Sequence, residues 1–367
     1  MATEAERPYR VVQWATGSVG KAALRHFAQS PVYELVGVLV FAAEKAGRDA
    51  GEIAGIGPIG LAATDDVEQI LALDADCVFY SPLWPDTDTV CRLLRSGKNV
   101  VTSTGPYYPT EIARDDFARI EQACAEGGTS FHGGGIHPGY AGDLLPLTLA
   151  RLASRVDHIH VHEVVNFRQE PSKYIEWTGM GKTPEQFRAE PALLGASVPY
   201  FAQSMAVIAD GLGRTIDEVT VAEIEIATAT ADIHYTGTET SDIPGVHGVV
   251  PAGTVAGQHH RWTAWSGGTP LITFHAKYTM GDDDIEPAWN YGHSHHLLVI
   301  DGDPPTELVL RAGAGPDGNP VYLGYTWTAM AAVNAIPAVC AAAPGPLGHL
   351  ELGLLRLPGV VHPKPAD

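Results

Sequence analysis

The sequence predicts an α/β protein of two domains, in which a doubly wound parallel sheet is followed by an α+β domain with a mixed sheet. Two observations support this fold class. Up to about residue 146, short apolar strands alternate with helical segments, which is the pattern of a parallel sheet. Beyond that point, longer segments alternate apolar and polar residues between Gly- and Pro-rich loops, as antiparallel strands with one buried face do.

In the first domain we expect strands at residues 9–14, 33–41, 76–81, 98–103 and 129–133, and helices at residues 65–73, 86–96 and 110–126. Ligands of such sheets bind beyond the carboxyl ends of the strands. Residues 81–84, 102–108 and 132–140 should therefore lie at the ligand-binding edge.

In the second domain we expect strands at residues 156–167, 219–234, 269–281, 293–301 and 306–312, helices at 141–153, 184–190 and 197–212, and a long loop at 237–257. The Ala-rich segment 326–343 is apolar nearly all round, which predicts one buried helix that returns to the first domain. The predicted boundaries are 1–146 for the first domain, completed by 326–350, then 147–325 for the second, and 351–367 for a tail.

A glycine motif follows the first strand. The strand runs into Ala15-Thr-Gly-Ser-Val-Gly20 and then into a helix, which is the pattern of a dinucleotide-binding turn. Gly17 has no Cβ, so the backbone can approach a pyrophosphate, and Gly20 allows close helix packing. We expect cofactor contacts from Ala15, Thr16, Gly17, Ser18, Val19, Gly20, Ser81, Pro82, Thr104 and Asn334. The alternative is a tight strand-to-helix turn in another kind of α/β protein.

The second strand bears on the choice of cofactor. It ends at Phe41-Ala-Ala without the acid that usually accepts from the ribose 2′-hydroxyl of NAD. Lys45 and Arg48 follow shortly, and cations suit a 2′-phosphate. The sequence therefore favours NADP(H), while Glu44 keeps NAD(H) open. The alternative is that the two cations are solvated loop charges.

Composition limits the class of protein. The net charge of −20 argues against general nucleic-acid binding. Four scattered cysteines argue for a reducing cytoplasm and against a disulfide framework. No apolar run reaches the length of a membrane span, and the polar, acidic start of the chain does not resemble a signal peptide. We therefore expect a cytoplasmic protein with a small-molecule substrate.

Several landmarks occur together in a family-specific order. They are Ala15–Gly20, Gly47-Arg-Asp-Ala-Gly51, Gly97-Lys-Asn-Val-Val-Thr-Ser-Thr104, His137-Pro-Gly-Tyr140 with Asp143-Leu-Leu-Pro146, and Asn334-Ala-Ile-Pro337. The chain resembles the dihydrodipicolinate reductase-like oxidoreductases, near 2,4-diaminopentanoate dehydrogenase and the native amine dehydrogenases. The resemblance implies a Rossmann domain, a mixed-sheet substrate and dimerisation domain that forms a homodimer, and hydride transfer between nicotinamide and a C=N or C=O carbon.

The chain departs from this family at two places. Amine dehydrogenases carry a glutamate after the strand that ends here at Thr104, whereas this chain has Gly105-Pro-Tyr-Tyr108 and no acid before Glu111. His137 stands where the family usually has Asn. The resemblance therefore implies membership of the family more firmly than an amine substrate.

The candidate catalytic groups follow from the need to move a proton when a hydride is transferred. His137 is the most suitable, since imidazole as a group titrates near neutrality, and it sits before a Pro-Gly turn; the alternative is a neutral histidine bonded to that turn. Tyr107 and Tyr108 can polarise a carbonyl or form an aromatic wall. Asp143 and Glu163 are candidate substitute carboxylates, although Asp143 also fits a structural role in a helix cap.

Two further sets of polar residues need interpretation. Asn334, on an apolar helix, needs a partner, which is the nicotinamide carboxamide, the substrate or a neighbouring helix. The second domain carries His158, His160 and His162 on one strand face and His293-Ser-His-His296 later. Without a cysteine or HExxH pattern nearby, we expect no metal and interpret these histidines as solvated or at a dimer interface. Trp177, Trp262 and Trp265 are expected in pocket walls or the core.

These observations predict an NADP(H)-preferring oxidoreductase that acts on a ketone, imine or amine. Two alternatives stay open at this point: a carbonyl reductase without an ammonia step, and a nucleotide-binding sensor that has lost catalysis.

Overall fold

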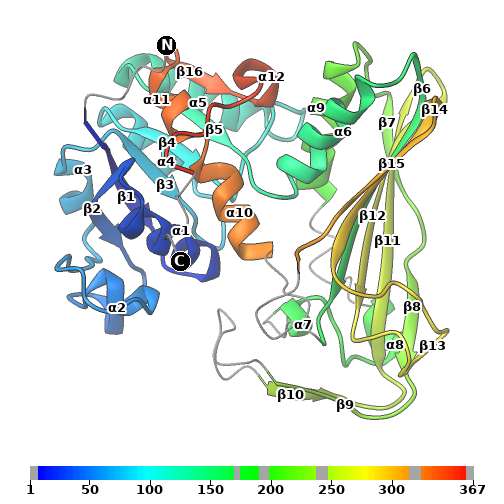
Figure 1. Ribbon diagram of the computed structural model, residues 1–367. Coiled ribbons are helices and arrows are strands. Elements are labelled where there is room, and N and C mark those ends of the chain that lie inside the picture. The colour runs from blue at the N-terminus through cyan, green and yellow to red at the C-terminus, as the bar shows by residue number, and fades with distance from the viewer. Residues whose placement is uncertain (1–6, 169–173, 190–197, 237–246, 314–323, 361–367) are drawn as a thin grey trace, which may run out of the picture. The chain divides into compact units, whose positions relative to one another are not determined.

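A six-stranded parallel sheet forms the centre of the first unit, which comprises residues 1–140 and 324–367 (Figure 1). The computed structural model describes residues 7–168, 174–189, 198–236, 247–313 and 324–360. In the order in which they pair, the strands are β16 (Gly345–Leu347), β5 (Ser130–Gly133), β4 (Asn99–Thr102), β3 (Cys77–Tyr80), β1 (Tyr9–Trp14) and β2 (Tyr33–Leu39). The doubly wound sheet predicted for the first domain is confirmed.

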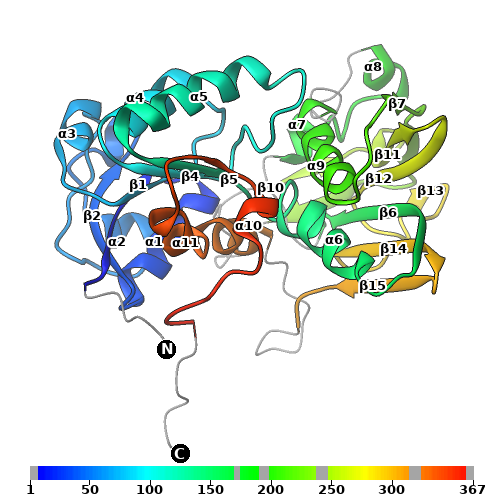
Figure 2. The ribbon, with the colours of Figure 1, turned by 90° about the horizontal axis from the view of Figure 1, so that it is seen from above.

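The strands of this sheet are apolar because both faces are covered. Helices α1 (Ser18–Gln29), α10 (Gly324–Val333) and α11 (Ile336–Ala341) lie on one face, and α3 (Val67–Ala72), α4 (Thr87–Arg95) and α5 (Arg114–Gly127) on the other (Figure 2). Neighbouring residues such as Val11 and Val12 are therefore both fully buried, one against each helical layer. This is why these strands read as continuous apolar runs.

The returning C-terminal helix is confirmed, but the expectation of one helix over 326–343 is wrong. The segment forms α10 and α11, which break at Asn334 and Ala335, because Pro337 has no N–H to continue the helical bonding to Val333. The Val333 carbonyl instead accepts a hydrogen bond of 3.1 Å from the Tyr33 hydroxyl of β2. This hydrogen bond, made possible by the break, connects the returning segment to β2, the edge strand of the sheet.

The chain after α11 adds a strand that the sequence analysis did not anticipate. β16 pairs in parallel with β5 and extends the sheet at its edge, where Pro346 is tolerated. A short helix, α12 (His349–Leu352), follows it. The expected tail over 351–367 is described only as far as residue 360; residues 361–367 lie outside the described part, as do residues 1–6 of the expected polar start.

The second unit, residues 141–323, is built on an eight-stranded mixed sheet. The strand order is β13 (Ile285–Glu286), β8 (Glu225–Ala229), β11 (Val255–Ser266), β12 (Thr269–Thr279), β6 (Arg155–Asn166), β14 (His295–Asp303) and β15 (Thr306–Leu310), and β7 (Glu218–Val221) also pairs with β11. Only the β6–β12 pair among these is parallel. The mixed sheet that was predicted is confirmed.

Two expectations for this sheet are wrong. β11, a central strand, was not predicted, since its consecutive His259, His260 and Arg261 conceal the apolar alternation. The expected strand over 219–234 is three strands: β7 and β8 pair with different ends of β11, and β9 (Ile233–Thr236) leaves the sheet to form a hairpin with β10 (His247–Val250). β10 lies in the expected loop 237–257, of which residues 237–246 are outside the described part.

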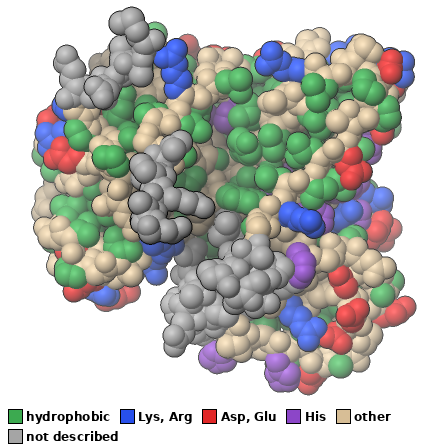
Figure 3. All heavy atoms as spheres, viewed as in Figure 1, with side chains coloured by type: hydrophobic (Ala, Val, Ile, Leu, Met, Phe, Trp, Pro, Cys, Tyr) green, Lys and Arg blue, Asp and Glu red, His purple; other side chains and the backbone are tan. Residues whose placement is uncertain are grey.

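Helices cover one face of the second sheet. The expected helix over 141–153 begins as a π-helical turn at Tyr140–Leu144 and continues as α6 (Leu145–Ala150), because Pro146 cannot donate to the turn before it. α7 (Tyr174–Trp177), α8 (Pro184–Ala189) and α9 (Val198–Gly211) follow, and residues 190 and 197 of the expected helices lie outside the described part. On the face shown in Figure 3, hydrophobic side chains gather over the part of this unit that holds α6 and α9.

The core under these helices is formed by alternate residues of the strands. Ile159 and Val161 of β6 and Phe274 of β12 are fully buried against Met205 and Ile208 of α9. Trp262, expected in a pocket wall or the core, is buried in this core.

No described helix is long and apolar enough to cross a membrane.

A buried histidine pair in the first unit makes stability depend on pH. Burial, and then the nearby His349, lower the pKa of His132 to about 3, and its Nδ1 lies 2.8 Å from the Leu347 carbonyl. In the unfolded chain the imidazole of His132 binds a proton with a pKa near 6.5, whereas in the folded chain it stays neutral at this pH. The free energy of unfolding therefore decreases as the pH falls below about 6.5. At pH 5 we expect His132 to lower the free energy of unfolding by about 2 kcal/mol, which urea denaturation at pH 7 and pH 5 would measure.

The control for this prediction keeps the donor. His132→Asn retains an N–H toward Leu347, and should reduce the difference between the free energies of unfolding at pH 7 and at pH 5. His234→Asn, at an exposed position on β9, should leave it unchanged. An equal pH dependence in His132→Asn and the unmodified protein contradicts the assignment.

Candidate functional site

The turn after β1 has the geometry of a phosphate-binding turn. Ala15 adopts φ of 74°, a left-handed conformation that costs a non-glycine residue about 1 kcal/mol and is most often kept at functional sites. α1 then begins at Ser18 with Gly17 as the preceding residue, and no side chain in the described chain caps its first turn. The free N–H groups and positive dipole end of this helix therefore point toward the turn, where an anion is stabilised.

The two glycines of the motif occupy different surroundings. A Cβ added to Gly17 would have no atom within 4 Å, so the backbone here is open to a ligand. A Cβ added to Gly20 would lie 2.2 Å from the carbonyl oxygen of Ala15, so the helix can approach the turn only with glycine at this position. The roles assigned to the two glycines agree with this geometry.

A buried glutamine, which the sequence analysis missed, supports the turn from below. The Nε2 of Gln13 lies 2.8 Å from the Ala15 carbonyl and 2.9 Å from the Ser81 hydroxyl. Ser81 in turn donates to the Trp14 carbonyl at 3.2 Å. Because its hydroxyl is used in this way, Ser81 links the end of β3 to the end of β1.

The cations expected after β2 lie on a short 3₁₀ helix, Ala43–Lys45, and the segment after it. The Nζ of Lys45 donates to the carbonyl and the hydroxyl of Thr16, at 3.3 Å and 3.2 Å, so this ammonium lies at the glycine turn. Burial, and then the charge of Lys21, lower the pKa of Lys45, and an anion at the turn would relieve both effects. Arg48 and Glu44 are exposed.

Large apolar side chains are exposed at the same edge of the sheet. Phe41 follows β2 and is 68% exposed, and Leu83 and Trp84 follow β3 and are 55% and 57% exposed. Exposed apolar side chains of this size at a ligand-binding edge suit a flat ring such as a purine. The sequence analysis had placed residues 81–84 at this edge without giving these side chains a role.

The loops after β4 and β5 pack together. The Tyr107 hydroxyl donates to the Ser103 carbonyl at 2.7 Å, and Thr104 donates its backbone N–H to the Thr102 hydroxyl at 3.0 Å. A Cβ on Gly133 would lie 2.3 Å from the Pro106 carbonyl. The segment Gly105–Tyr108 is therefore a fixed part of this edge. Tyr108 lies beside Gly348, since a Cβ there would be 3.7 Å from its ring.

His137 and Asn334 lie at segment ends in the first unit. His137 is half-buried in the loop after β5, whose backbone closes through a hydrogen bond of 2.7 Å from Tyr140 to Gly135. Thr328 of α10 packs against the same loop, 3.2 Å from a Cβ placed on Gly135. Asn334 is half-buried at the break between α10 and α11.

The two candidate carboxylates belong to the second unit. Asp143 is buried and accepts a hydrogen bond of 3.1 Å from the Ser204 hydroxyl, which joins the π-helical turn to α9. Glu163 is half-buried on β6 and accepts a hydrogen bond of 3.2 Å from Tyr278 of β12. Each carboxylate is thus oriented by a hydroxyl donor.

The other face of the second sheet carries a group that we call the histidine cluster. Its members are His158, His160 and His162 of β6, His259 of β11 and His275 of β12. The rings of His162 and His275 stack at 4.0 Å, as do those of His158 and His160 with a tilt of 39°. The sequence analysis noted the three histidines of β6 but not the two that complete the cluster.

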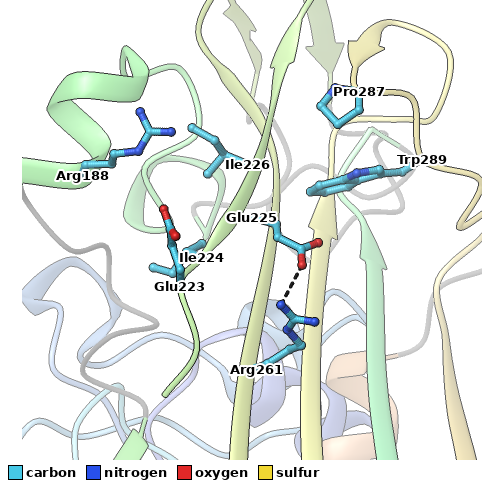
Figure 4. Close-up of a pocket in the computed structure, with 8 residues that line it drawn as sticks. All are labelled: Arg188, Glu223, Ile224, Glu225, Ile226, Arg261, Pro287 and Trp289. Atoms are coloured by element: carbon cyan, nitrogen blue, oxygen red, sulfur yellow. Dashed lines mark ion pairs between the residues drawn. The ribbon is translucent and has the colours of Figure 1, made fainter. Parts of the chain in front are cut away.

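A hollow of about 450 Å³ lies in the second unit beside this cluster. Figure 4 shows its lining by Arg188, Glu223, Ile224, Glu225, Ile226, Arg261, Pro287 and Trp289. The Glu225 carboxylate pairs with Arg261 at 2.8 Å inside it. None of the candidate residues of the sequence analysis lines this hollow.

Comparison with known proteins identifies relatives. A family model for the 2,4-diaminopentanoate dehydrogenase C-terminal domain matches residues 140–357. An amine dehydrogenase of Streptomyces virginiae is 30% identical over 366 residues, with 94% of this chain and 96% of that protein covered. A 4-hydroxy-tetrahydrodipicolinate reductase of Synechococcus elongatus is 38% identical over 63 residues, which are 17% of this chain and 23% of that protein.

Solved structures show the same fold. The structure of the amine dehydrogenase from Mycobacterium smegmatis has a TM-score of 0.75 at 20% identity, with 96% of this chain and 98% of that chain covered. GenD2 from gentamicin A biosynthesis, solved in complex with NAD, has a TM-score of 0.56 at 11% identity, with 96% and 92% covered.

The contrast between the two glycines gives a paired prediction. Gly17→Val should abolish cofactor binding and change the melting temperature of the free protein by a few degrees at most, because the added side chain enters open space. Gly20→Val should lower that melting temperature strongly, because its Cβ meets the Ala15 carbonyl at 2.2 Å. Both are measured by thermal denaturation and by fluorescence titration with NADPH and NADH. Unchanged cofactor affinity in a folded Gly17→Val variant would show that the pyrophosphate lies elsewhere.

Proposed function

The chain belongs to the 2,4-diaminopentanoate dehydrogenase family and is an NAD(P)-dependent dehydrogenase, and from this premise we propose that it transfers a hydride between nicotinamide and the carbon of a ketone, imine or amine, with NADP(H) preferred. The observation that carries the proposal is the open Gly17 backbone at the uncapped N-terminus of α1, next to the Lys45 ammonium. We also propose that the protein is a cytoplasmic homodimer, which its free cysteines and its resemblance to the family support.

The residues at this edge fit the parts of the cofactor. The first turn of α1 offers N–H groups to the pyrophosphate. Lys45 and Arg48 supply positive charge where a 2′-phosphate would lie, and no carboxylate ends β2 to accept from a ribose hydroxyl. Phe41, Leu83 and Trp84 offer an apolar surface to the adenine ring.

The chain's own residues must handle the proton that accompanies hydride transfer. When bound, nicotinamide supplies or accepts the hydride. We assign the proton at the substrate heteroatom to His137, which lies in the loop after β5 and carries an imidazole that can both donate and accept a proton. Tyr107 fits this role less well, because its hydroxyl already donates to the Ser103 carbonyl. Tyr108 serves better as a wall.

The loop after β4 bears on the choice between an amine and a carbonyl substrate. The resemblance to amine dehydrogenases implies a glutamate there, whereas Gly105-Pro-Tyr-Tyr108 places no negative charge at this point. A positively charged iminium loses more from this absence than a neutral carbonyl does, because electrostatic stabilisation is among the larger catalytic contributions. A carbonyl reductase without an ammonia step is therefore the second candidate.

Turnover separates these two functions. NADPH oxidation with a panel of ketones, with and without ammonium, identifies an amine-forming enzyme by its ammonium requirement and a carbonyl reductase by the absence of that requirement. Tight NADPH binding without turnover of any ketone or amine would contradict both.

Cofactor preference gives a prediction. Replacing both Lys45 and Arg48 by Ala should weaken NADPH binding by on the order of 2–3 kcal/mol, roughly 30- to 150-fold, because charge-assisted contacts to the 2′-phosphate are lost. NADH affinity should change little. Arg92→Ala, which removes an exposed cation of α4, is the matched control and should alter neither affinity. Equal NADH and NADPH affinity in the unmodified protein would contradict the preference.

The missing glutamate gives a second prediction. At fixed pH, rising ammonium should increase NADPH oxidation with a ketone by less than about tenfold, unless Glu163 or Asp143 supplies the missing charge. If ammonium does increase the rate strongly, Glu163→Gln or Asp143→Asn should remove that dependence; Asn at 143 retains an acceptor for Ser204. A strong ammonium requirement that survives both substitutions would refute this account of the site.

A further inference from the structure

The histidine cluster of the second sheet is ordered by carboxylates at its two ends. At one end, Glu225 can only accept, so the Nδ1 of His259, 3.3 Å away, carries the proton. The Nε2 of a neutral His259 then accepts from the Nδ1 of His275 at 3.0 Å. This leaves the Nε2 of His275 without a proton, with its lone pair directed away from Glu225.

At the other end of the cluster, Asp301 determines which nitrogen of His160 carries the proton. A carboxylate oxygen of Asp301 lies 3.3 Å from the Nε2 of His160, which favours a proton on that nitrogen. The Nδ1 of a neutral His160 then also has a free lone pair. That atom faces the Nε2 of His275 at 3.3 Å. Two lone pairs at this distance repel each other unless a cation lies between them.

We propose that His160, His162 and His275 bind a divalent transition-metal ion of the zinc type, with water as the fourth ligand. One ligand atom from each lies within 4.8 Å of the others. In a tetrahedral site with Zn–N bonds of about 2.05 Å, two nitrogens are about 3.3 Å apart, which matches the separation of the His160 and His275 nitrogens.

His162 provides the third ligand. Its Nδ1 is buried and has no hydrogen-bond partner among the residues that the structure describes, which is unusual for a buried polar atom. Its ring is stacked on His275 with an angle of 7° between the planes, so the ring must tilt to direct a nitrogen at a shared ion. Burial lowers the pKa of His162 to about 3 and that of His275 to about 2, and neutral imidazole is the form that binds metal.

Charged side chains of both signs surround the proposed metal site. Lys277 opposes a cation, since it helps to lower the pKa values of His162 and His275. Asp301 next to His160, and Glu225 behind His259, favour one. The chain His275–His259–Glu225 resembles the outer shell that orients metal-binding histidines in known sites, where the ligand donates its second N–H to a carboxylate or another acceptor. The proposal replaces the sequence-based expectation that this protein holds no metal.

The test is direct measurement of zinc on the full chain. Chelator-treated protein, dialysed against buffered Zn²⁺, should take up one zinc per chain, and Co²⁺ in its place should show the visible absorption of a four-coordinate ion. His160→Gln and His275→Gln should each weaken zinc binding more than about 100-fold, since each removes a ligand. His259→Gln should weaken it about 10- to 100-fold, because it removes only the orienting partner.

Controls separate this site from surface binding and from loss of structure. His234→Gln, at an exposed position on β9, should leave zinc affinity unchanged. The far-UV circular dichroism spectrum and the melting temperature of the zinc-free protein should stay close to those of the unmodified protein in all four variants, which shows that both units are folded. The proposal is overturned if the unmodified protein takes up no stoichiometric zinc, or if His160→Gln and His275→Gln keep their affinity. It is equally overturned if these substitutions change only the oligomeric mass, which would make the cluster a contact between copies of the chain.

Discussion

The close approach of α1 to the end of β1 is the constraint on which the first unit depends. The contact is between backbone atoms, since Gly20 lies against the Ala15 carbonyl at a distance that excludes any side chain. The same carbonyl accepts from the buried Gln13 amide, so its position is determined from two sides. Because the turn is held in this way, Ala15 can keep a strained backbone and the first turn of α1 stays directed at one point. A helix displaced by the width of a methyl group would lose both the support and the direction of its N–H groups.

The parts of the fold that follow from local sequence were predicted well, and the parts that depend on pairing partners were not. The parallel strands are apolar on both faces, so their burial is visible in the sequence itself. β11 was missed, because His259, His260 and Arg261 look polar until the neighbouring strands are known: His260 is buried beside Trp262, and His259 bonds to His275. The division of α10 from α11 had a local signal in Pro337, whose consequence becomes clear only with Tyr33 as the alternative donor.

The same distinction applies to the candidate sites. Residues 15–20 form a continuous motif whose function depends on backbone geometry over a few residues, so the sequence sufficed to predict the turn. The supporting Gln13 and the exposed Phe41 and Trp84 carry no comparable pattern, since their meaning comes from Ser81 and from the sheet edge. The histidine cluster combines residues about 100 positions apart along the chain. Only the register that places His162 opposite His275 brings them together, and register between distant strands is set by the whole sheet.

The distribution of charge connects the cofactor site to the choice of substrate. The protein carries a net charge of −20, so an anionic cofactor must be held against the overall field by local groups. Lys45 is placed to do this, since its ammonium is fixed at Thr16 before any ligand arrives. Charge in the loop 105–108 would act on the substrate rather than on the cofactor. A carboxylate there would help a cationic iminium, but it would also repel an oxygen that gains negative charge during carbonyl reduction. In the proposed function, a loop without a carboxylate favours neutral substrates over cationic ones, because it does not repel the negative charge that develops on a carbonyl oxygen.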